Sequence, residues 1–296
     1  MKLRPFLPSK YRMRIQYVSD LHLEFYDTVP EWESLVKPCA KYLALPGDIA
    51  QPSSPLWKPF FDYASSHWER VFYVTGNHEY YNKKPKHLWD FAYHDTWIER
   101  HEQIRNSLLS YTNIVLLDST TPSYHLEEEN VAIVGNTVWS YIPPEIMYDV
   151  EHIMNDYNYI ALDRKRAIKA EHTNQWHIEQ RKCIQEEILK WTERKVDIVV
   201  LTHHMPSFAL IHPRYKGSIA NCAFASDSEE LMLASVKAWI YGHTHNVDSR
   251  IIGTTQVVVN ARGYRGEVLE GFRTEAYVEF PTSFPPVAVS QSYPPA

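Results

Sequence analysis

The hydrophobic pattern of the chain consists of short apolar runs that alternate with longer amphipathic stretches. The short runs are rich in β-branched and aromatic residues and show little polar alternation, which is typical of strands buried on both faces. Five of them are predicted as core strands, at residues 13–19, 42–45, 71–74, 197–202 and 238–241. Further strand signal occurs in "NIVLLD", "NVAIVGNTVW", "SRIIG" and "TQVVVN".

Helical spacing is found between these runs, at residues 56–68, 86–109 and about 160–195. The longest of these stretches places its apolar residues on one stripe and its charged residues elsewhere. The stripe consists of Trp176, Cys183, Ile184, Ile188 and Trp191. The order of strands and helices predicts a layered α/β domain with two packed sheets.

Both ends of the chain lack this periodicity. Residues 281–296 are rich in proline and predict an extended tail, and residues 1–12 predict an N-terminal extension. A single domain is therefore expected over residues 13–280.

Composition indicates a soluble globular protein, with 44% hydrophobic and 22% charged residues among 296. The net charge of -6 gives no general electrostatic reason to bind duplex nucleic acid, so long duplexes are not expected as partners. No apolar run approaches the ~18 residues of a membrane span, and the basic N-terminus lacks a secretory signal. We therefore expect a cytoplasmic protein without a membrane partner. Three cysteines, Cys39, Cys183 and Cys222, suggest neither disulfides nor a thiolate site.

Metal-ligand chemistry follows each of the five core strands, in "SDLHLE", "PGD", "TGNHEY", "THHMPS" and "YGHTH". The loops beyond the carboxyl ends of strands in an open α/β sheet line a common crevice, so these side chains can meet in space. Carboxylate, amide and imidazole groups without a thiolate suit Mn, Fe or Zn. The candidate ligands are Asp20, His22, Asp48, Asn77, His203, His243 and His245.

This number of ligands is too large for one ion that keeps an open position, and it is about right for two. Asp48, which follows a glycine in a tight turn, is the natural bridging carboxylate. Two divalent ions carry more positive charge than the two aspartates can neutralise. The positive charge that remains would favour binding of a phosphate anion. It would also lower the pKa of a metal-bound water, which supplies hydroxide at neutral pH.

These blocks resemble the calcineurin-like metallophosphoesterase family, and they occur in the family's order. The matching motifs are Asp20-x-His22, Gly47-Asp48, Gly76-Asn77-His78-Glu79, the histidine of "LTHH" and Gly242-His243-x-His245. The resemblance implies a four-layer α/β/β/α sandwich of two packed mixed β-sheets, with the metal site at the carboxyl ends of the strands. It also implies that the protein hydrolyses phosphate esters.

The same resemblance implies a dinuclear centre with two divalent metal ions as cofactors, Mn, Fe or Zn. A hydroxide that bridges the metals would attack phosphorus. The family pattern places Asp48 between two ligand triplets: Asp20, His22 and His245 for the first metal, and Asn77, His203 and His243 for the second.

His78 has a different role by this resemblance, because it faces the substrate and stabilises the phosphoryl oxygens or protonates the leaving alcohol. A carboxylate can orient such an imidazole, and Glu79, one residue on, is available for that role. In "THHMPS", His203 is the expected ligand because it directly follows the strand and Thr202. His204 is the alternative ligand, and it could instead contact substrate or fill a pocket.

Two further segments, residues 135–140 and 260–264, resemble a bacterial-type branch of the family. "GNTVWS" departs from the branch only by Val138, which replaces a leucine, and "NARGY" matches. Arg262 could pair with a substrate phosphate or carboxylate, and Trp139 could wall the pocket. Alternatively, Trp139 is a core residue and Arg262 a surface ion-pair partner. The segment 139–159 is either a cap over the site or ordinary loop packing.

Two classes of function fit these residues. One is a hydrolase of phosphate esters, and the other is a catalytically silent, metal-stabilised module that binds a protein. Silent members of the family have lost ligands or the catalytic histidine, whereas none is missing here, which favours hydrolysis. "SDLHLE" differs from the start of the protein serine/threonine phosphatases, so a small phosphodiester or nucleotide-like substrate is favoured over a phosphomonoester or a phosphoprotein.

Overall fold

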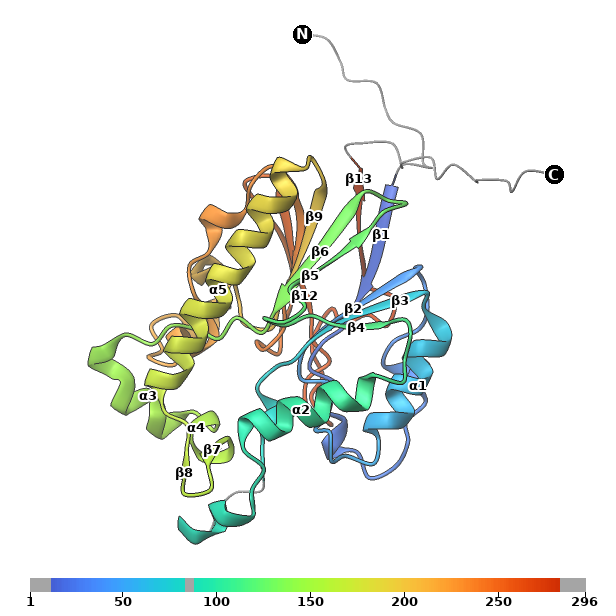
Figure 1. The fold of residues 1–296 in the computed structure, drawn as a ribbon. Coiled ribbons are helices and arrows are strands. Elements are labelled where there is room, and N and C mark those ends of the chain that lie inside the picture. Colours follow the sequence, from blue (N-terminus) through green and yellow to red (C-terminus); the bar gives the residue numbers. More distant parts are fainter. Residues whose placement is uncertain (1–11, 83–87, 283–296) are drawn as a thin grey trace, which may run out of the picture.

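The computed structural model describes residues 12–82 and 88–282, which form two large β-sheets with helices on their outer faces (Figure 1). The strands are β1 (Arg12–Tyr17), β2 (Tyr42–Pro46), β3 (Arg70–Val74), β4 (Ile114–Leu116), β5 (Ser123–Leu126), β6 (Val131–Asn136), β7 (Ala161–Asp163), β8 (Arg166–Ala167), β9 (Asp197–Thr202), β10 (Val236–Ile240), β11 (Val247–Ile252), β12 (Thr255–Asn260) and β13 (Tyr277–Pro281). The α-helices are α1 (Trp57–His67), α2 (Trp97–Leu108), α3 (Met147–Ile153), α4 (Asp156–Tyr159), α5 (Ala170–Glu193) and α6 (Asn221–Phe224). Short 3-10 helices are η2 (Leu23–Phe25), η3 (Trp32–Ser34), η4 (His78–Tyr80), η5 (Leu88–Tyr93), η6 (Pro144–Ile146), η7 (Phe208–Leu210), η8 (Pro213–Tyr215) and η9 (Glu229–Leu231).

Both large sheets are mixed. The first has the strand order β13-β1-β2-β3-β4, in which β1 to β4 run parallel and β13 is antiparallel to β1. The second has the order β11-β12-β10-β9-β6-β5, with a parallel centre and an antiparallel strand at each edge. A bridge between Ser19 and Ala261 joins the sheets just beyond the carboxyl ends of β1 and β12. All five predicted core strands are present, whereas β5 and β13 are strands that the sequence pattern did not predict.

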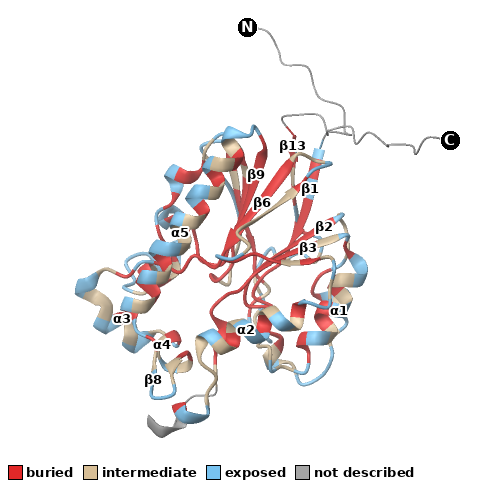
Figure 2. Cartoon of the chain, in the orientation of Figure 1, coloured by how far each residue is buried: buried red, intermediate tan, exposed pale blue. Residues whose placement is uncertain are grey.

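Three hydrophobic layers hold the sandwich together. One lies between the two sheets, where Ile15 and Phe72 of the first sheet belong to the same cluster as Val199 and Ile240 of the second. Another joins the first sheet to α1 and α2, and a third joins the second sheet to α5. Buried residues accordingly follow the strands through the centre of the molecule (Figure 2). The predicted four-layer α/β/β/α architecture is confirmed.

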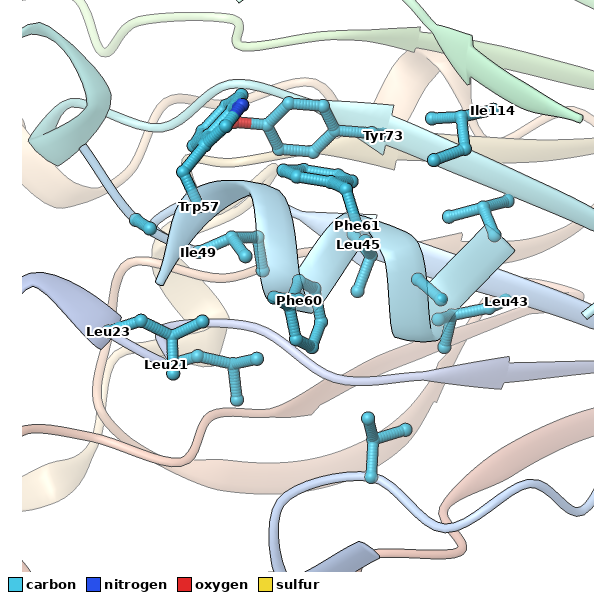
Figure 3. Packing of buried hydrophobic residues seen from close by; sticks show 14 of the residues in the cluster. Leu21, Leu23, Leu43, Leu45, Ile49, Trp57, Phe60, Phe61, Tyr73 and Ile114 are labelled. Carbon is cyan, nitrogen blue, oxygen red and sulfur yellow. The ribbon is translucent and has the colours of Figure 1, made fainter. Parts of the chain in front are cut away.

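Strand β2 illustrates why the core strands are apolar without alternation. Leu43 and Leu45 belong to the cluster that packs against α1, together with Phe60 and Phe61 (Figure 3). Residues on the opposite face of the same strand, including Ala44, belong to the cluster between the two sheets. Since successive side chains of a strand point to opposite faces, a strand covered on both faces needs apolar residues throughout.

The predicted helix at 160–195 begins only at Ala170, and this part of the prediction is wrong. Residues before it form the small hairpin β7–β8, whose turn is fixed by Asp163. The Asp163 carboxylate accepts hydrogen bonds from the backbone N–H groups of Lys165 and Arg166 at 2.7 and 3.2 Å. A short aspartate that binds its own backbone favours a turn over a helix. None of the described helices is long and apolar enough to cross a membrane.

The stretch 86–109 also differs from the single helix that its spacing predicted. The described part, from residue 88, contains η5 followed by α2, and α2 starts at a capping box. Glu99 N donates to the Thr96 hydroxyl, while the Glu99 carboxylate accepts from Thr96 N at 2.8 Å. Reciprocal bonds of this kind fix a helix start, which separates α2 from the preceding residues.

The predicted N-terminal extension and proline-rich tail lie outside the described residues, apart from Arg12, Pro281 and Thr282. Arg12 and Pro281 are paired at the ends of β1 and β13. The limits of the domain, residues 13–280, stay a prediction.

Truncation of the helix-facing core is expected to destabilise the fold. Phe60 is fully buried between α1 and the first sheet, so Phe60→Ala should lower the free energy of unfolding by about 3–5 kcal/mol in chemical denaturation. Phe208→Ala is the matched control, because its ring is 47% exposed, and it should cost less than about 1 kcal/mol. Similar losses for both variants would contradict this account of the core.

Candidate metal centre and active site

Loops from both sheets meet where the carboxyl ends of the strands converge. Asp20 N donates to Gly47 O at 3.1 Å and His22 N to Asp48 O at 3.0 Å, so the loops after β1 and β2 run side by side. Gly242 N donates to His203 O at 2.9 Å, which joins the loops after β9 and β10. Residues that are distant in the sequence therefore share one buried site.

Five of the candidate ligands have an unusual backbone conformation. Their φ angles are positive: Asp20 (54°), His22 (46°), Asp48 (54°), His243 (70°) and His245 (34°). A non-glycine residue in this conformation costs of order 1–3 kcal/mol, and it persists only where the surrounding structure enforces it. Strain of this kind concentrates at functional sites. The concentration of this strain in the loops of the site supports a functional role for these residues, which depends on the directions of their side chains rather than on stability.

One group of potential metal ligands consists of Asp20, His22 and His245, whose donor atoms lie within 4.8 Å of one another. The Nε2 atoms of the two histidines are 2.9 Å apart, and His245 Nε2 lies 3.8 Å from Asp20 Oδ1. Both nitrogens can donate lone pairs to one cation, and the carboxylate supplies the negative charge that a cation requires.

A second group consists of Asp48, His203 and His243, and Asn77 adjoins it. His203 Nε2 lies 3.0 Å from Asn77 Oδ1 and 3.5 Å from Asp48 Oδ1. His243 Nε2 is buried and has no hydrogen-bond partner among the described residues, which normally costs about 1–3 kcal/mol. A cation at this position would satisfy it.

Asp48 lies between the two groups. One of its carboxylate oxygens is near His203, and the other is 3.8 Å from His22 Nε2. Both groups contain carboxylate and imidazole donors, the second also has the Asn77 amide, and Asp48 adjoins both, so the site fits a pair of divalent metal ions.

Neighbouring groups fix the direction of the histidine rings. His203 Nδ1 is 2.9 Å from Pro46 O, and His245 Nδ1 is 2.7 Å from a carboxylate oxygen of Glu267. Contacts at Nδ1 leave Nε2 of each ring facing the site. Metal-binding histidines are oriented in this way by carboxylates and backbone carbonyls.

Glycines make room for these side chains. A Cβ at Gly76 would collide with the Asp48 carboxylate and would lie 2.6 Å from His203 Cε1, and one at Gly242 would lie 2.6 Å from Pro46 O. Gly47 combines such a close approach with a φ of 84°. Any larger residue at these positions would displace the ligands.

The charges of the site favour a bound cation. Burial lowers the pKa of His203, but the charge of Asp48 outweighs this and raises the pKa to about 9. Burial raises the pKa of Asp48, but His203 and His78 hold it well below its usual range. The buried carboxylate of Asp48 thus favours the protonated form of His203. A metal ion bound there would replace this proton.

Glu79 does not orient His78, so that expectation is corrected. Its buried carboxylate accepts hydrogen bonds from the backbone N–H groups of Asp48, Ile49 and Gly76, at 3.1, 2.8 and 2.8 Å. The Tyr73 hydroxyl donates to it as well, at 2.8 Å. Glu79 therefore ties the loop after β2 to the loop after β3, because its side chain points into the sheet and away from the imidazole.

The carboxylate beside His78 belongs to Glu24, in η2. Its Oε1 lies 3.0 Å from His78 Nδ1, and the Tyr264 hydroxyl lies 3.2 Å from His78 Nε2. The ring also packs against His22 and Tyr81, with centroid distances of 4.3 Å. His78 is buried, and both of its nitrogens are held by named partners.

His204 lies behind the site rather than among the ligand atoms. Its Nδ1 is 2.9 Å from the Ser140 hydroxyl, and its ring stands 4.2 Å from that of His243. His203, the expected residue of the pair, is the one whose Nε2 faces Asp48. This arrangement agrees with the preference for His203 over His204 as the ligand.

Neither Trp139 nor Arg262 is among the residues that line the two cavities beside this site, and their assignment to substrate binding stays a prediction. Trp139 is buried and packs against Trp176 and His204, as the core interpretation predicted. Arg262 donates to Glu267 O at 3.0 Å and lies over the Phe272 ring, so it supports the loop that carries Glu267. Its partner is a backbone carbonyl, and not the acid that a surface ion pair would need.

Two cavities open beside the site. The metal-side cavity, about 630 Å³, is bordered by Asp48, Asn77, His243 and His245. The outer cavity, about 720 Å³, is bordered by none of the seven candidate ligands. Both are of the size of small-molecule sites. They share four residues: His78, Tyr81, Asn155 and Tyr264.

The segment 139–159 packs on the core and borders the site. Ile142 and Val150 are buried in a cluster with Ala170 of α5 and residues of α6, which is ordinary packing. Asn155 borders both cavities, and Tyr159 borders the outer one, while a role as a cap over the site stays a prediction.

Sequence reasoning missed four residues of the site: Glu24, Asp156, Tyr264 and Glu267. Asp156 is buried and accepts hydrogen bonds from Asn77 Nδ2 and the Tyr81 hydroxyl, both at 2.7 Å. Glu24 and Tyr264 lie inside motifs that carried a signal, "SDLHLE" and "NARGY". Asp156 begins the short helix α4 and Glu267 stands in a loop, and neither segment is long enough to show a periodicity that would reveal them.

Comparison with known proteins agrees with this geometry. A family model described as calcineurin-like phosphoesterase matches residues 13–247. A protein of Acanthamoeba polyphaga mimivirus is 32% identical over 288 residues, which cover 90% of this chain and 97% of that protein. The crystal structure of phosphopantetheinyl hydrolase from Mycobacterium tuberculosis is similar in fold, with a TM-score of 0.60 at 17% identity over 84% of this chain and 89% of that one.

The family match covers most of the chain and includes every block that suggested the resemblance. The chain therefore belongs to the calcineurin-like phosphoesterase family and is a metallophosphoesterase, an enzyme that hydrolyses phosphoric esters.

Proposed function

We propose that this enzyme hydrolyses a small phosphodiester or a nucleotide-like substrate at a dinuclear metal centre. The observation that supports this most directly is the pair of cavities that meet at His78, next to the group around Asp48. A phosphodiester carries two substituents on one phosphorus, and two adjoining cavities offer room for both. A phosphomonoester would need only one of them.

The ligand groups suggest how the metals would be held. Asp48 would serve both ions, and each ion would have a triplet of its own: Asp20, His22 and His245 for the first, and Asn77, His203 and His243 for the second. When bound, the two ions would supply a hydroxide nucleophile at neutral pH and would neutralise charge on the phosphoryl oxygens. Mn, Fe and Zn all match this donor set.

His78 is the residue proposed to act on the leaving group. Glu24 holds Nδ1, so Nε2 is left to donate a proton to the departing oxygen. The hydroxyl of Tyr264 lies beside Nε2, in a position that the departing oxygen would share. In such a step His78 carries the proton and Glu24 is a positioning residue that keeps the imidazole in one tautomer.

Removal of metal is expected to abolish hydrolysis of bis(4-nitrophenyl) phosphate, and added Mn²⁺ should restore it. Asp48→Asn should bind less metal, measured by elemental analysis. Its turnover should fall by more than the ~10–100-fold typical of groups that only orient ligands, because Asp48 adjoins both ligand groups. Asp149→Asn, at an exposed position, is the matched control and should retain both properties. Activity that survives full metal removal would refute the dinuclear mechanism.

Loss of the His78 imidazole should separate catalysis from metal binding. His78→Ala is expected to keep its metal content while kcat falls by ~10²–10⁴-fold, as is typical for a general acid.

Loss of the Glu24 charge should have a smaller effect than loss of the imidazole. Glu24→Gln should lower kcat by ~10–100-fold, because the ring loses the group that orients it. Glu33→Gln, exposed in η3, is the control. If Mn-loaded wild-type protein showed no esterase activity but bound a protein partner, a catalytically silent module would be the better description.

A further inference from the structure

The outer cavity differs from the metal-side cavity in what lines it. Four aromatic rings border it, from Phe25, Tyr81, Tyr159 and Tyr264, and none of the metal-ligand candidates does. Phe25 and Tyr264 meet edge to face, with centroids 5.5 Å apart, and Tyr81 and Tyr159 pack at 5.2 Å. Aromatic faces therefore come from the loops of both sheets and from α4.

Polar groups in the outer cavity are mainly amides. Gln51 and Asn155 belong to its lining, and neither side chain makes a hydrogen bond to another described residue. Arg265 is the one arginine or lysine among the described residues that line the cavity, and it is bonded to Asp27, while His78 lies at the border with the metal-side cavity. The cavity thus offers ring faces and hydrogen-bonding amides, but little free positive charge.

We infer that the outer cavity is the leaving-group subsite and that it takes a planar heteroaromatic group, such as the base of a nucleoside. This inference rests on the proposed function, and it specifies the side of the substrate that departs. Rings stack on bases, and amides hydrogen-bond to their polar edges, so the lining matches such a group. A leaving group that ends in further phosphates would need more positive charge than Arg265, which is paired with Asp27, and His78 supply.

The direction of the reaction decides which cavity receives the leaving group. Attack on phosphorus is in line, so the nucleophile arrives from the side of Asp48 and the ester oxygen departs on the opposite side. His78 Nε2 faces Tyr264, which borders both cavities. The oxygen of water bonds to phosphorus as the P–O bond to the nucleoside breaks, and the nucleoside oxygen takes the proton of His78. One proton of the attacking water stays on the new phosphate group, and the other restores the proton of His78. The departing nucleoside then lies in the outer cavity.

Tyr159 provides the test position, because it borders only the outer cavity and lies away from the ligands. Binding of free adenosine to the full-length protein is measured by titration calorimetry, so the readout does not depend on hydrolysis. Adenosine should bind and ribose should not. Tyr159→Leu should weaken adenosine binding by about 5-fold or more, and Tyr159→Phe, which keeps the ring, should bind nearly as well as wild type.

Tyr148→Leu is the matched control, since Tyr148 is 72% exposed on α3 and borders neither cavity. It should leave adenosine binding unchanged. Equal binding to the Tyr159→Leu and wild-type proteins, or no binding at all, would overturn the assignment of the outer cavity.

A kinetic measurement separates this inference from the proposed function. Adenosine should inhibit hydrolysis of bis(4-nitrophenyl) phosphate competitively, and Tyr159→Leu should raise the inhibition constant by the same factor. Hydrolysis without competition by adenosine would overturn the leaving-group subsite but leave the proposed function intact. Adenosine binding that depends on the Tyr159 ring, in a metal-loaded protein without esterase activity, would instead refute the proposed function and with it the leaving-group role.

Discussion

A carboxylate removed from water must be surrounded by positive charge or by hydrogen-bond donors, and Asp48 imposes this requirement on the whole site. It is only 2% exposed, with His203 near one oxygen and His22 near the other. The backbone N–H of His78 donates to it at 2.9 Å. Because burial makes an uncompensated charge so costly, the loops that bring these groups to Asp48 have little freedom in their arrangement.

The backbone that carries Asp48 is held by another buried acid. The Glu79 carboxylate accepts hydrogen bonds from N–H groups of the loops after β2 and β3, and these bonds hold the turn at Gly47 in place. Burial and the nearby charge of Asp48 raise the pKa of Glu79 to about 8. The raised pKa means that burial of the charged Glu79 costs folding free energy, and the large cores between the layers offset that cost. The positive φ angles of the ligands are tolerated for the same reason.

Much of the wall of the two cavities comes from segments other than the strand ends. Strand ends carry the candidate metal ligands, whereas η2, the end of segment 139–159 and the loop that contains Tyr264 and Glu267 contribute to the cavity walls. Loops can change without disturbing the sheets, so rigid strand ends and variable cavity walls can coexist in one fold.

The sequence by itself determined the core strands, the layered architecture and the candidate ligands. These follow from local patterns. A strand covered on both faces must be apolar throughout, so the first polar residues after the apolar run mark the end of the strand. Local patterns failed where a side chain bound the neighbouring backbone, as at Asp163, whose turn makes the helix begin later than predicted.

Only the tertiary structure decided which groups meet. Glu24 and Glu79 are both acids close in sequence to metal ligands, yet one faces His78 and the other faces the backbone of the loop after β2. The Tyr264 hydroxyl contacts His78 although the two residues are 186 positions apart in the sequence. Side-chain direction depends on how separate loops pack on one another, and that packing is a property of the folded molecule that no single stretch of sequence contains.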